Sequence, residues 1–122
     1  MWDRRARVTA THDGDTLIVV LDQGFGDTKS IHLRLLNTFA PELAEKGGPD
    51  TRSFVQHWLD RHDPDGDEWP YIVTTERVKT GHELMTFSRY VGTLTDKAGE
   101  SLNEAVEAFV KEHGYGGGTG SK

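Results

Sequence analysis

Three stretches near the start of the chain are rich in β-branched and apolar residues, and they predict β-strands. They are residues 5–12, 17–21 and 29–36. In the third stretch, Ile31, Leu33 and Leu35 alternate with polar residues, which is typical of a strand buried on one face. The Asp-Gly-Asp sequence at residues 13–15 predicts a tight hairpin turn, and the sequence DQGFGD at residues 22–27 predicts a second turn.

The hydrophobic period changes after a polar loop at residues 37–48. Over residues 49–62 the apolar side chains recur at helical spacing, and Trp58 lies within this apolar stripe. We therefore predict a helix that places Trp58 in the core. Asp50 or Thr51 is the expected N-terminal cap of this helix.

The second half of the chain predicts two more strands, at residues 69–78 and 84–94, and a final helix at residues 101–114. Ser101 and Glu104 have the spacing of a capping box at the start of that helix. Its apolar face consists of Leu102, Val106, Phe109 and Val110. The glycine at its end is expected to stop it.

The predicted order is three strands, a helix, two strands and a helix. This order predicts a mainly β protein with helices (α+β), built as an OB-type five-stranded Greek-key barrel. Closure into a barrel removes the sheet edges that a small open sheet would expose. We expect one domain over residues 1–114, followed by a flexible glycine-rich tail over residues 115–122.

The composition narrows the possible functions. The chain has 122 residues, a formal net charge of −6 and no cysteine, which excludes disulfides, thiolate metal sites and a cysteine nucleophile. No apolar run approaches the ~20 residues that span a bilayer, and no signal peptide is visible, so we expect a soluble cytoplasmic monomer without a membrane partner. The negative net charge argues against strong non-specific binding of nucleic acid, but it does not exclude a local basic cleft or a bound metal.

The Asp-Gly-Asp turn has two interpretations. Asp-Gly is a common hairpin dipeptide, so Asp13 and Asp15 can serve turn geometry alone. The functional interpretation needs further charged groups, and Glu42, Arg34 and Arg89 offer them. In an OB barrel the loops after the first and third strands can meet at one rim, where these groups would form a site for phosphodiester hydrolysis. A hard cation such as Ca²⁺ takes carboxylate oxygens at such a site.

Four segments resemble the staphylococcal nuclease-like (thermonuclease) family in their order and spacing. They are VTATHDGDTLIVV, IHLRLLNTFAPE, FSRYVGTL and LNEAV. The resemblance spans about residues 5–115, and the LDQGFGD loop is similar to that of small phage-encoded members, whose host would be bacterial. It implies the OB-type barrel and calcium-dependent endonuclease-type hydrolysis of DNA and RNA.

The resemblance also implies roles for individual residues. Asp15 resembles the first metal-ligand aspartate, and the backbone carbonyl of Ala40 would be a further metal ligand. Arg34 and Arg89 resemble the two phosphate-contacting arginines, and Glu42 resembles the catalytic glutamate that orients or deprotonates water. The resemblance thus predicts Ca²⁺ as the cofactor and nucleic acid as the substrate.

The chain departs from the family at one metal-ligand position. Where the family usually has aspartate or asparagine, two positions before Pro41, this chain has Phe39, and a phenyl ring cannot coordinate calcium. Asp13 can compensate as a ligand, directly or through water, although its role as a turn cap is an equal alternative. The departure supports a second hypothesis, a catalytically weakened nuclease-like OB module that binds nucleic acid or a protein partner without cutting.

Other residues give weaker signals. Tyr90 and Tyr115 are candidates for base stacking in substrate binding. The histidines predict no ligand set, because His57 and His62 are five positions apart and do not share a helix face. The acidic stretch at residues 63–68 does not have the glycine and glutamate positions of an EF-hand and is interpreted as a solvated loop.

Overall fold

The chain folds into a closed five-stranded barrel with two helices, as a computed structural model that describes residues 2–76 and 89–115. The strands are β1 (Trp2–Asp13), β2 (Thr16–Gly24), β3 (Asp27–Leu35), β4 (Tyr71–Glu76) and β5 (Arg89–Asp96). The helices are α1 (Gly48–Arg61) and α3 (Leu102–His113). The order of elements and the barrel confirm the predicted OB-type fold class.

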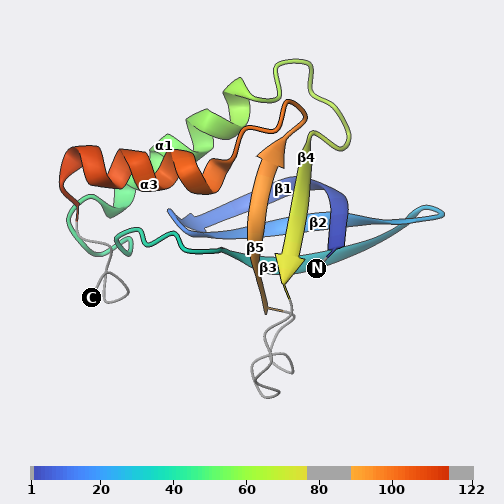
Figure 1. The fold of residues 1–122 in the computed structure, drawn as a ribbon, viewed down its shortest axis with the longest axis horizontal. Helices are drawn as coiled ribbons and strands as arrows, with labels where there is room; N and C mark the ends of the chain where they lie inside the picture. The colour runs from blue at the N-terminus through green and yellow to red at the C-terminus, as the bar shows by residue number, and fades with distance from the viewer. Residues whose placement is uncertain (1, 77–88, 116–122) are drawn as a thin grey trace.

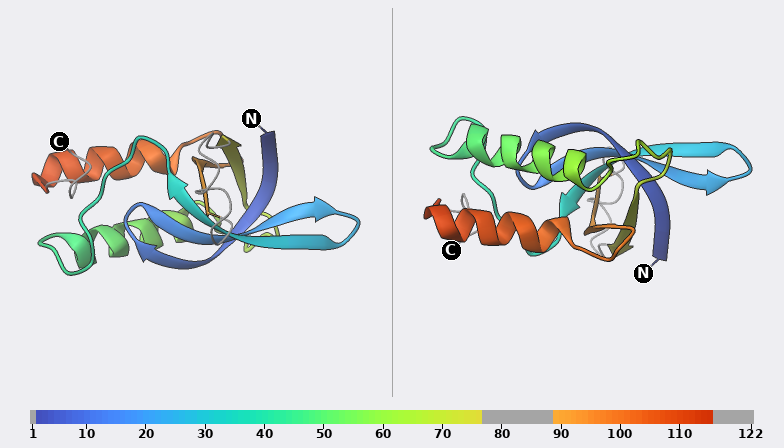
Figure 2. Two further views of the ribbon diagram at one scale, coloured as in Figure 1. Left: turned by 90° about the horizontal axis from the view of Figure 1, so that it is seen from below. Right: turned by 90° about the horizontal axis from the view of Figure 1, so that it is seen from above.

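The strand order around the barrel is β1-β2-β3-β5-β4. β1, β2 and β3 form an antiparallel meander, β3 pairs with β5 in parallel, and β4 is antiparallel to both β5 and β1. The two helices lie beside each other at one end of the barrel, and the β2–β3 hairpin extends from the opposite end (Figure 1, Figure 2). No helix in the described ranges is long and apolar enough to cross a membrane.

The alternation read from the sequence determines which side chains fill the barrel. The strands contribute the fully buried residues Ala6, Leu17, Val19, Leu21, Ile31, Leu33, Leu35, Val73 and Leu94. The helices close this core with their apolar faces, and Phe54 of α1 stacks on Phe109 of α3 at a centroid distance of 4.4 Å. Trp58 is 4% exposed, which confirms its predicted place in the core.

The turn between β2 and β3 is shorter than the sequence predicts. The turn expected over residues 22–27 contains only two residues, because β2 continues to Gly24 and β3 begins at Asp27. Phe25 and Gly26, between the strands, have positive φ angles of 55° and 81°. The predicted turn is therefore confirmed in position, but it is shorter than its residue types indicate, because cross-strand pairing extends both strands into the stretch.

The cap of α1 also corrects the sequence analysis. The N-cap is Gly47, with φ at 87°, and no side chain caps the helix. Asp50 and Thr51 lie inside the first turns instead, and the hydroxyl of Thr51 donates to the Gly47 carbonyl at 2.7 Å. The expected capping of α3 is confirmed, because Ser101 Oγ accepts from the Glu104 N–H and Gly114 ends the helix in the left-handed conformation.

Tyr115, which the sequence analysis assigned to the flexible tail, packs against the fold. Its hydroxyl donates to Asp50 Oδ2 at 2.9 Å, and its ring lies 5.4 Å from that of His113. A Cβ atom at Gly47 would collide with the Tyr115 ring, so this contact and the positive φ both favour glycine there. The tyrosine thus links the end of α3 to the start of α1.

Asn103 joins the helical layer to the barrel. Its side-chain amide donates to the carbonyls of Leu36 and Gly92, and its oxygen accepts from the Leu94 N–H at 3.2 Å. The residue is 7% exposed, so water does not readily replace these partners. Because Leu36 follows β3 while Gly92 and Leu94 belong to β5, one side chain holds the parallel β3–β5 pairing and α3 together.

The substitution Asn103→Ala is expected to lower the free energy of unfolding by about 3 kcal/mol, since it removes three hydrogen bonds and leaves buried backbone groups unsatisfied. Chemical denaturation measures the effect, with Glu107→Ala on the exposed face of the same helix as the control. A loss no larger than that of the control would contradict the linking role of Asn103.

Candidate functional site

The Asp-Gly-Asp turn joins β1 to β2 and packs against two other segments. Asp13 Oδ1 accepts a hydrogen bond from the Asp15 N–H at 3.2 Å, which is a turn-capping interaction. A Cβ atom at Gly14 would collide with the side chains of Ala40 and Thr51. The turn therefore lies against both the loop after β3 and the first turns of α1, and glycine is required for this close approach.

Asp15 connects the turn to the end of β3. Its carboxylate, in a residue only 7% exposed, accepts from the Ala40 N–H at 3.2 Å and from the Thr16 hydroxyl at 3.3 Å. Its backbone carbonyl accepts from the Leu35 N–H at 2.9 Å. The contact of Asp15 with Ala40 thus runs through the Ala40 N–H, while the sequence analysis assigned the Ala40 carbonyl to a metal.

The surroundings of Asp15 change its acidity. Burial raises its pKa to about 6, and the neighbouring carboxyl group of Asp13 contributes in the same direction. The Ala40 N–H and the Arg34 guanidinium act in the opposite sense. Two carboxyl groups at close range in a partly desolvated turn repel each other when both are ionised, so a cation near them would be stabilising.

Arg34 is placed beside Asp15 by the register of β3 against β2. Its register partner is Thr16, and its guanidinium lies 3.7 Å from Asp15 Oδ2. The Arg34 side chain remains 46% exposed, and its guanidinium lies 5.9 Å from the centre of the Phe39 ring. Within the described part of the chain it donates no hydrogen bond, so its N–H groups are available to a ligand.

Arg34 also lines a hollow of about 310 Å³ on the outer face of the sheet. The other lining residues are His12, Thr16, Ile18 and His32. β5 begins at Arg89, whose register partner on β3 is His32, so the backbone of Arg89 lies beside that of a residue that lines the hollow. The side chain of Arg89 lies outside what the structure describes, and its predicted phosphate contact stays a prediction.

Glu42 lies in the loop between β3 and α1, with its side chain in solvent. Its N–H donates to Glu45 Oε1 at 2.8 Å, and Gly48 packs closely against its carbonyl. In the described ranges no ion pair joins Glu42 to Arg34, and Glu42 does not form a three-donor group with Asp13 and Asp15. The fold therefore brings Asp15 into contact with both Arg34 and Ala40, whereas no hydrogen bond or ion pair in the described ranges joins the Glu42 side chain to these residues.

Phe39 lies beside Arg34 and is 40% exposed. We call the turn at residues 13–15 together with Arg34, Phe39, Ala40 and Glu42 the rim. Asp13 and Asp15 supply hard carboxylate oxygens of the kind that Ca²⁺ prefers, so the donor chemistry of the rim fits a calcium ion. The phenyl ring at position 39 contributes no donor, and calcium affinity rises with the number of charged ligands, so a weak site is expected.

The two tyrosines proposed for base stacking have partners within the protein. Tyr90 is half-buried against the core, and its hydroxyl accepts from Lys29 Nζ at 3.2 Å. The ring of Tyr115 packs near Phe109 and His113, and its hydroxyl bond to Asp50 raises its pKa. A packing role explains Tyr115 without substrate. Tyr90 pairs with the buried Leu33 of β3 and packs against the core, so its predicted stacking on a base stays a prediction.

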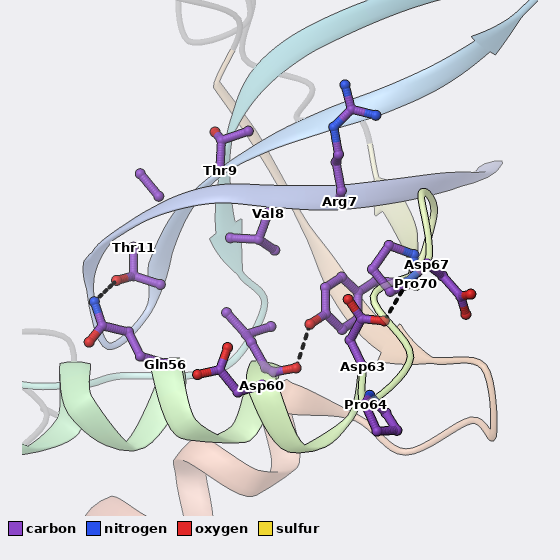
Figure 3. A pocket seen from close by; sticks show the side chains of 13 residues that line it. Arg7, Val8, Thr9, Thr11, Gln56, Asp60, Asp63, Pro64, Asp67 and Pro70 are labelled. Atoms are coloured by element: carbon purple, nitrogen blue, oxygen red, sulfur yellow. Dashed lines mark hydrogen bonds between the residues drawn. The ribbon is translucent and has the colours of Figure 1, made fainter.

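A larger groove, of about 620 Å³, lies between β1 and α1 and was not predicted from the sequence. Figure 3 shows Asp60 on α1 and Asp63 on the following loop across from β1, where the Arg7 side chain points away from them. Asp67 also lines the groove. These carboxylates would repel a phosphate, so the smaller hollow beside Arg34 is the better place for a nucleic-acid backbone.

The sequence analysis also missed a group formed by His62, Asp96 and Glu100. Their ligand atoms all lie within 4.8 Å of one another, and no other such group of three occurs in the described ranges. The histidine and the carboxylates are more than thirty positions apart, so no local spacing reveals the group. A tight acidic turn after a strand, DKAGE at residues 96–100, was the only visible signal.

The comparisons with known proteins do not identify a family. A scan against protein-family models finds no match, and a search of curated proteins finds none.

The raised pKa of Asp15 predicts a pH-dependent stability. In the folded chain the carboxyl group titrates at about 6 instead of 3.8, so between these values the folded state holds more protons than the unfolded state. The free energy of unfolding therefore falls as pH rises through this window, and it stays lowered at higher pH. Asp15→Asn removes the destabilising ionisation of this carboxyl group. The variant should therefore have a higher melting temperature at neutral pH, with little change at about pH 4.

Thermal unfolding of both proteins between about pH 4 and pH 8, with a chelator present, measures the difference. Asp22→Asn is the matched control, and its effect on stability should have the opposite sign. The reason is that the Gly24 N–H and the Arg5 guanidinium lower the pKa of Asp22. That variant should lose stability at neutral pH. A pH-independent difference for Asp15→Asn would show that the Asp15 carboxyl group titrates normally.

Proposed function

We propose that the chain is a calcium-dependent nuclease that hydrolyses phosphodiester bonds of DNA or RNA at the rim. The observation that carries this proposal is the 3.7 Å separation of the Asp15 carboxylate from the Arg34 guanidinium, with the arginine half exposed over a hollow. The two side chains suit a metal ion and a phosphate bound next to each other. The buried Asp15 carboxylate would attract the ion, and the accessible Arg34 guanidinium would attract the phosphate oxygens.

Arg34 would bind the phosphate and stabilise the transition state. A guanidinium has five N–H donors in a planar fork, which suits two oxygens of a phosphate group. Asp15 holds this guanidinium from one side, and the Phe39 ring lies near its face. Preorganised donors aimed at developing negative charge are among the largest contributions to catalysis. Arg89 is proposed for the same role on the strength of its position at the start of β5.

Asp15, with Asp13 and the Ala40 carbonyl, would hold the calcium ion. When bound, Ca²⁺ polarises the phosphate and offsets the repulsion between the two carboxylates. Glu42 would orient or deprotonate the attacking water, a role that needs a solvent-accessible carboxylate on a loop able to approach the phosphate. Its exposed position beside Pro41 meets the first of these needs.

The test of this proposal is degradation of single-stranded DNA in millimolar-range Ca²⁺, the order expected of a weak site. Arg34→Ala should lower kcat by about 10²–10³-fold, and Glu42→Ala by about 10²–10⁴-fold, because each removes a group used in the transition state. Fluorescent product release measures the rates, with Arg61→Ala and Glu112→Ala as charge-matched surface controls. Both catalytic variants should keep the wild-type melting temperature within a few degrees.

Full activity in Arg34→Ala and Glu42→Ala, from preparations free of contaminating nuclease, would overturn the catalytic assignment. A wild-type chain that cleaves neither DNA nor RNA at any calcium concentration would overturn the nuclease proposal itself.

A second function is favoured by one observation, the exposed Phe39 ring near Arg34. A ring beside a guanidinium forms a surface that stacks on a base or an apolar side chain while the cation binds an acidic group. The rim would then bind nucleic acid or a protein partner without cutting. The net charge of −6 favours a protein partner, because a phosphate backbone would be repelled by the rest of the surface.

Phe39→Asp discriminates between the two functions. For a nuclease with a weakened metal site, a carboxylate at this position should raise calcium affinity and cleavage at least about tenfold, since it adds a charged ligand. For a binding module it should leave cleavage undetectable and reduce partner binding. Calcium calorimetry and the DNA assay measure both outcomes. Phe39→Asn is the matched control, because it removes the ring without adding charge.

A further inference from the structure

We propose that His62, Asp96 and Glu100 form a transition-metal site, with Zn²⁺ as the expected ion, that is separate from the rim. His62 follows the end of α1, Asp96 ends β5, and Glu100 lies in the turn before α3. A metal bound to all three would join the helical layer to the barrel. The proposed role is a structural one, the stabilisation of the folded chain.

The distances among the three side chains suit a single ion. His62 Nε2 lies 3.0 Å from Glu100 Oε1 and 3.7 Å from Asp96 Oδ2, and all three ligand atoms fall within 4.8 Å of one another. Zinc bonds of ~2.0–2.2 Å in a tetrahedral arrangement place neighbouring ligand atoms about 3.3–3.6 Å apart. Small side-chain rotations therefore convert the present arrangement into a coordination sphere.

The histidine ring is already oriented for metal binding. Its Nδ1 lies 2.8 Å from the Trp58 carbonyl, and since a carbonyl oxygen only accepts, Nδ1 carries the hydrogen. The ring also stacks on Trp58 at a centroid distance of 3.9 Å. Nε2 is thereby directed at the two carboxylates. A backbone carbonyl that fixes the far nitrogen is the usual support of a metal-binding histidine.

Asp96 presents one oxygen toward the same point. Its Oδ1 accepts hydrogen bonds from the N–H groups of Ala98 and Glu100 at 2.9 and 2.8 Å, which fixes the carboxylate in the turn. Its side chain is only 9% exposed, and Oδ2 accepts no hydrogen bond from the described residues. A carboxylate nine-tenths buried, with one oxygen fixed and the other directed at an imidazole, is preorganised for a cation.

The local charge favours a cation as well. Burial, and then the carboxylates of Asp63, Asp60 and Asp96, raise the pKa of Tyr71, whose ring lies beneath this corner of the fold. The nearest ion-paired lysine, Lys97, is engaged by Asp67 at 2.5 Å. A divalent ion among His62, Asp96 and Glu100 would offset part of this negative charge.

The donor set selects the class of metal. An imidazole nitrogen with two carboxylate oxygens suits Zn²⁺ and related transition ions, whereas Ca²⁺ and Mg²⁺ prefer oxygen donors alone. The site also lies away from the rim. Gly14 of the rim turn packs on Thr51 of α1, and Thr51 lies eleven residues before His62, which corresponds to about 16 Å along a helix axis.

His113 provides an internal comparison. Its Nδ1 lies 2.9 Å from the Phe109 carbonyl, and its ring lies 4.1 Å from the Phe109 ring, so it repeats the geometry of His62 on Trp58. In the described ranges His113 has no carboxylate in ion-pair contact. Two histidines at helix ends therefore share the same ring stacking and the same contact with a backbone carbonyl. His62 differs from His113 in having two carboxylates beside it.

The test is a titration of the full chain, first freed of metal with a chelator, with Zn²⁺ alone. Calorimetry should show one ion bound, and the melting temperature should rise by roughly 10 °C when free Zn²⁺ exceeds its dissociation constant about 100-fold. His62→Gln should weaken zinc binding at least about tenfold and, at the same zinc concentration, remove about half of this rise or more. His113→Gln, the matched control, should retain both, and so should Asp15→Asn at the rim.

Glu100→Gln guards against a folding defect in the His62 variant. Glu100 is 67% exposed, so its substitution should leave the metal-free melting temperature nearly unchanged while it weakens zinc binding. Absence of a zinc response in the wild-type chain, or an undiminished response in both His62→Gln and Glu100→Gln, would overturn the proposal. Because the readouts are binding and melting temperature, these outcomes are independent of whether the rim cleaves DNA.

Discussion

Closure of the barrel through the parallel β3–β5 pairing is the constraint on which the rest of the structure depends. β3 and β5 are separated in the sequence by α1, β4 and the segments that connect them, and their pairing brings Arg34 and Arg89 onto adjacent strands. Asn103 then holds the seam between these strands from the helical side. Without this closure, the first three strands would form an open meander with exposed edges.

Local sequence signals predicted the elements well where one face of an element is buried. The alternation at Ile31, Leu33 and Leu35 identified β3, and the apolar stripe containing Trp58 identified α1. Boundaries were less accurate where pairing or packing competes with residue preference. The hairpin beyond Asp22 keeps strand pairing through residues that favour turns, and α1 begins after a glycine because Tyr115 occupies the space beside it.

The candidate site was predictable only in part, for a physical reason. The motif positions indicated Asp15 and Arg34, and the register of β2 against β3 places them in contact. The position of the Glu42 side chain depends on a loop whose conformation has no periodic signature. The group at His62 was invisible for a different reason, since its members come from three elements that meet only after the barrel has closed.

The four residues of the Asp-Gly-Asp-Thr turn each have a local structural task. Asp13 caps the turn, Gly14 permits the approach to α1, Asp15 holds the Ala40 N–H, and the Thr16 hydroxyl donates to Asp15. Selection for folding alone would therefore preserve this tetrapeptide whether or not the chain catalyses a reaction. The tetrapeptide in a sequence therefore indicates a fold. The chemistry must be inferred from neighbouring residues such as Phe39, which have no comparable structural role.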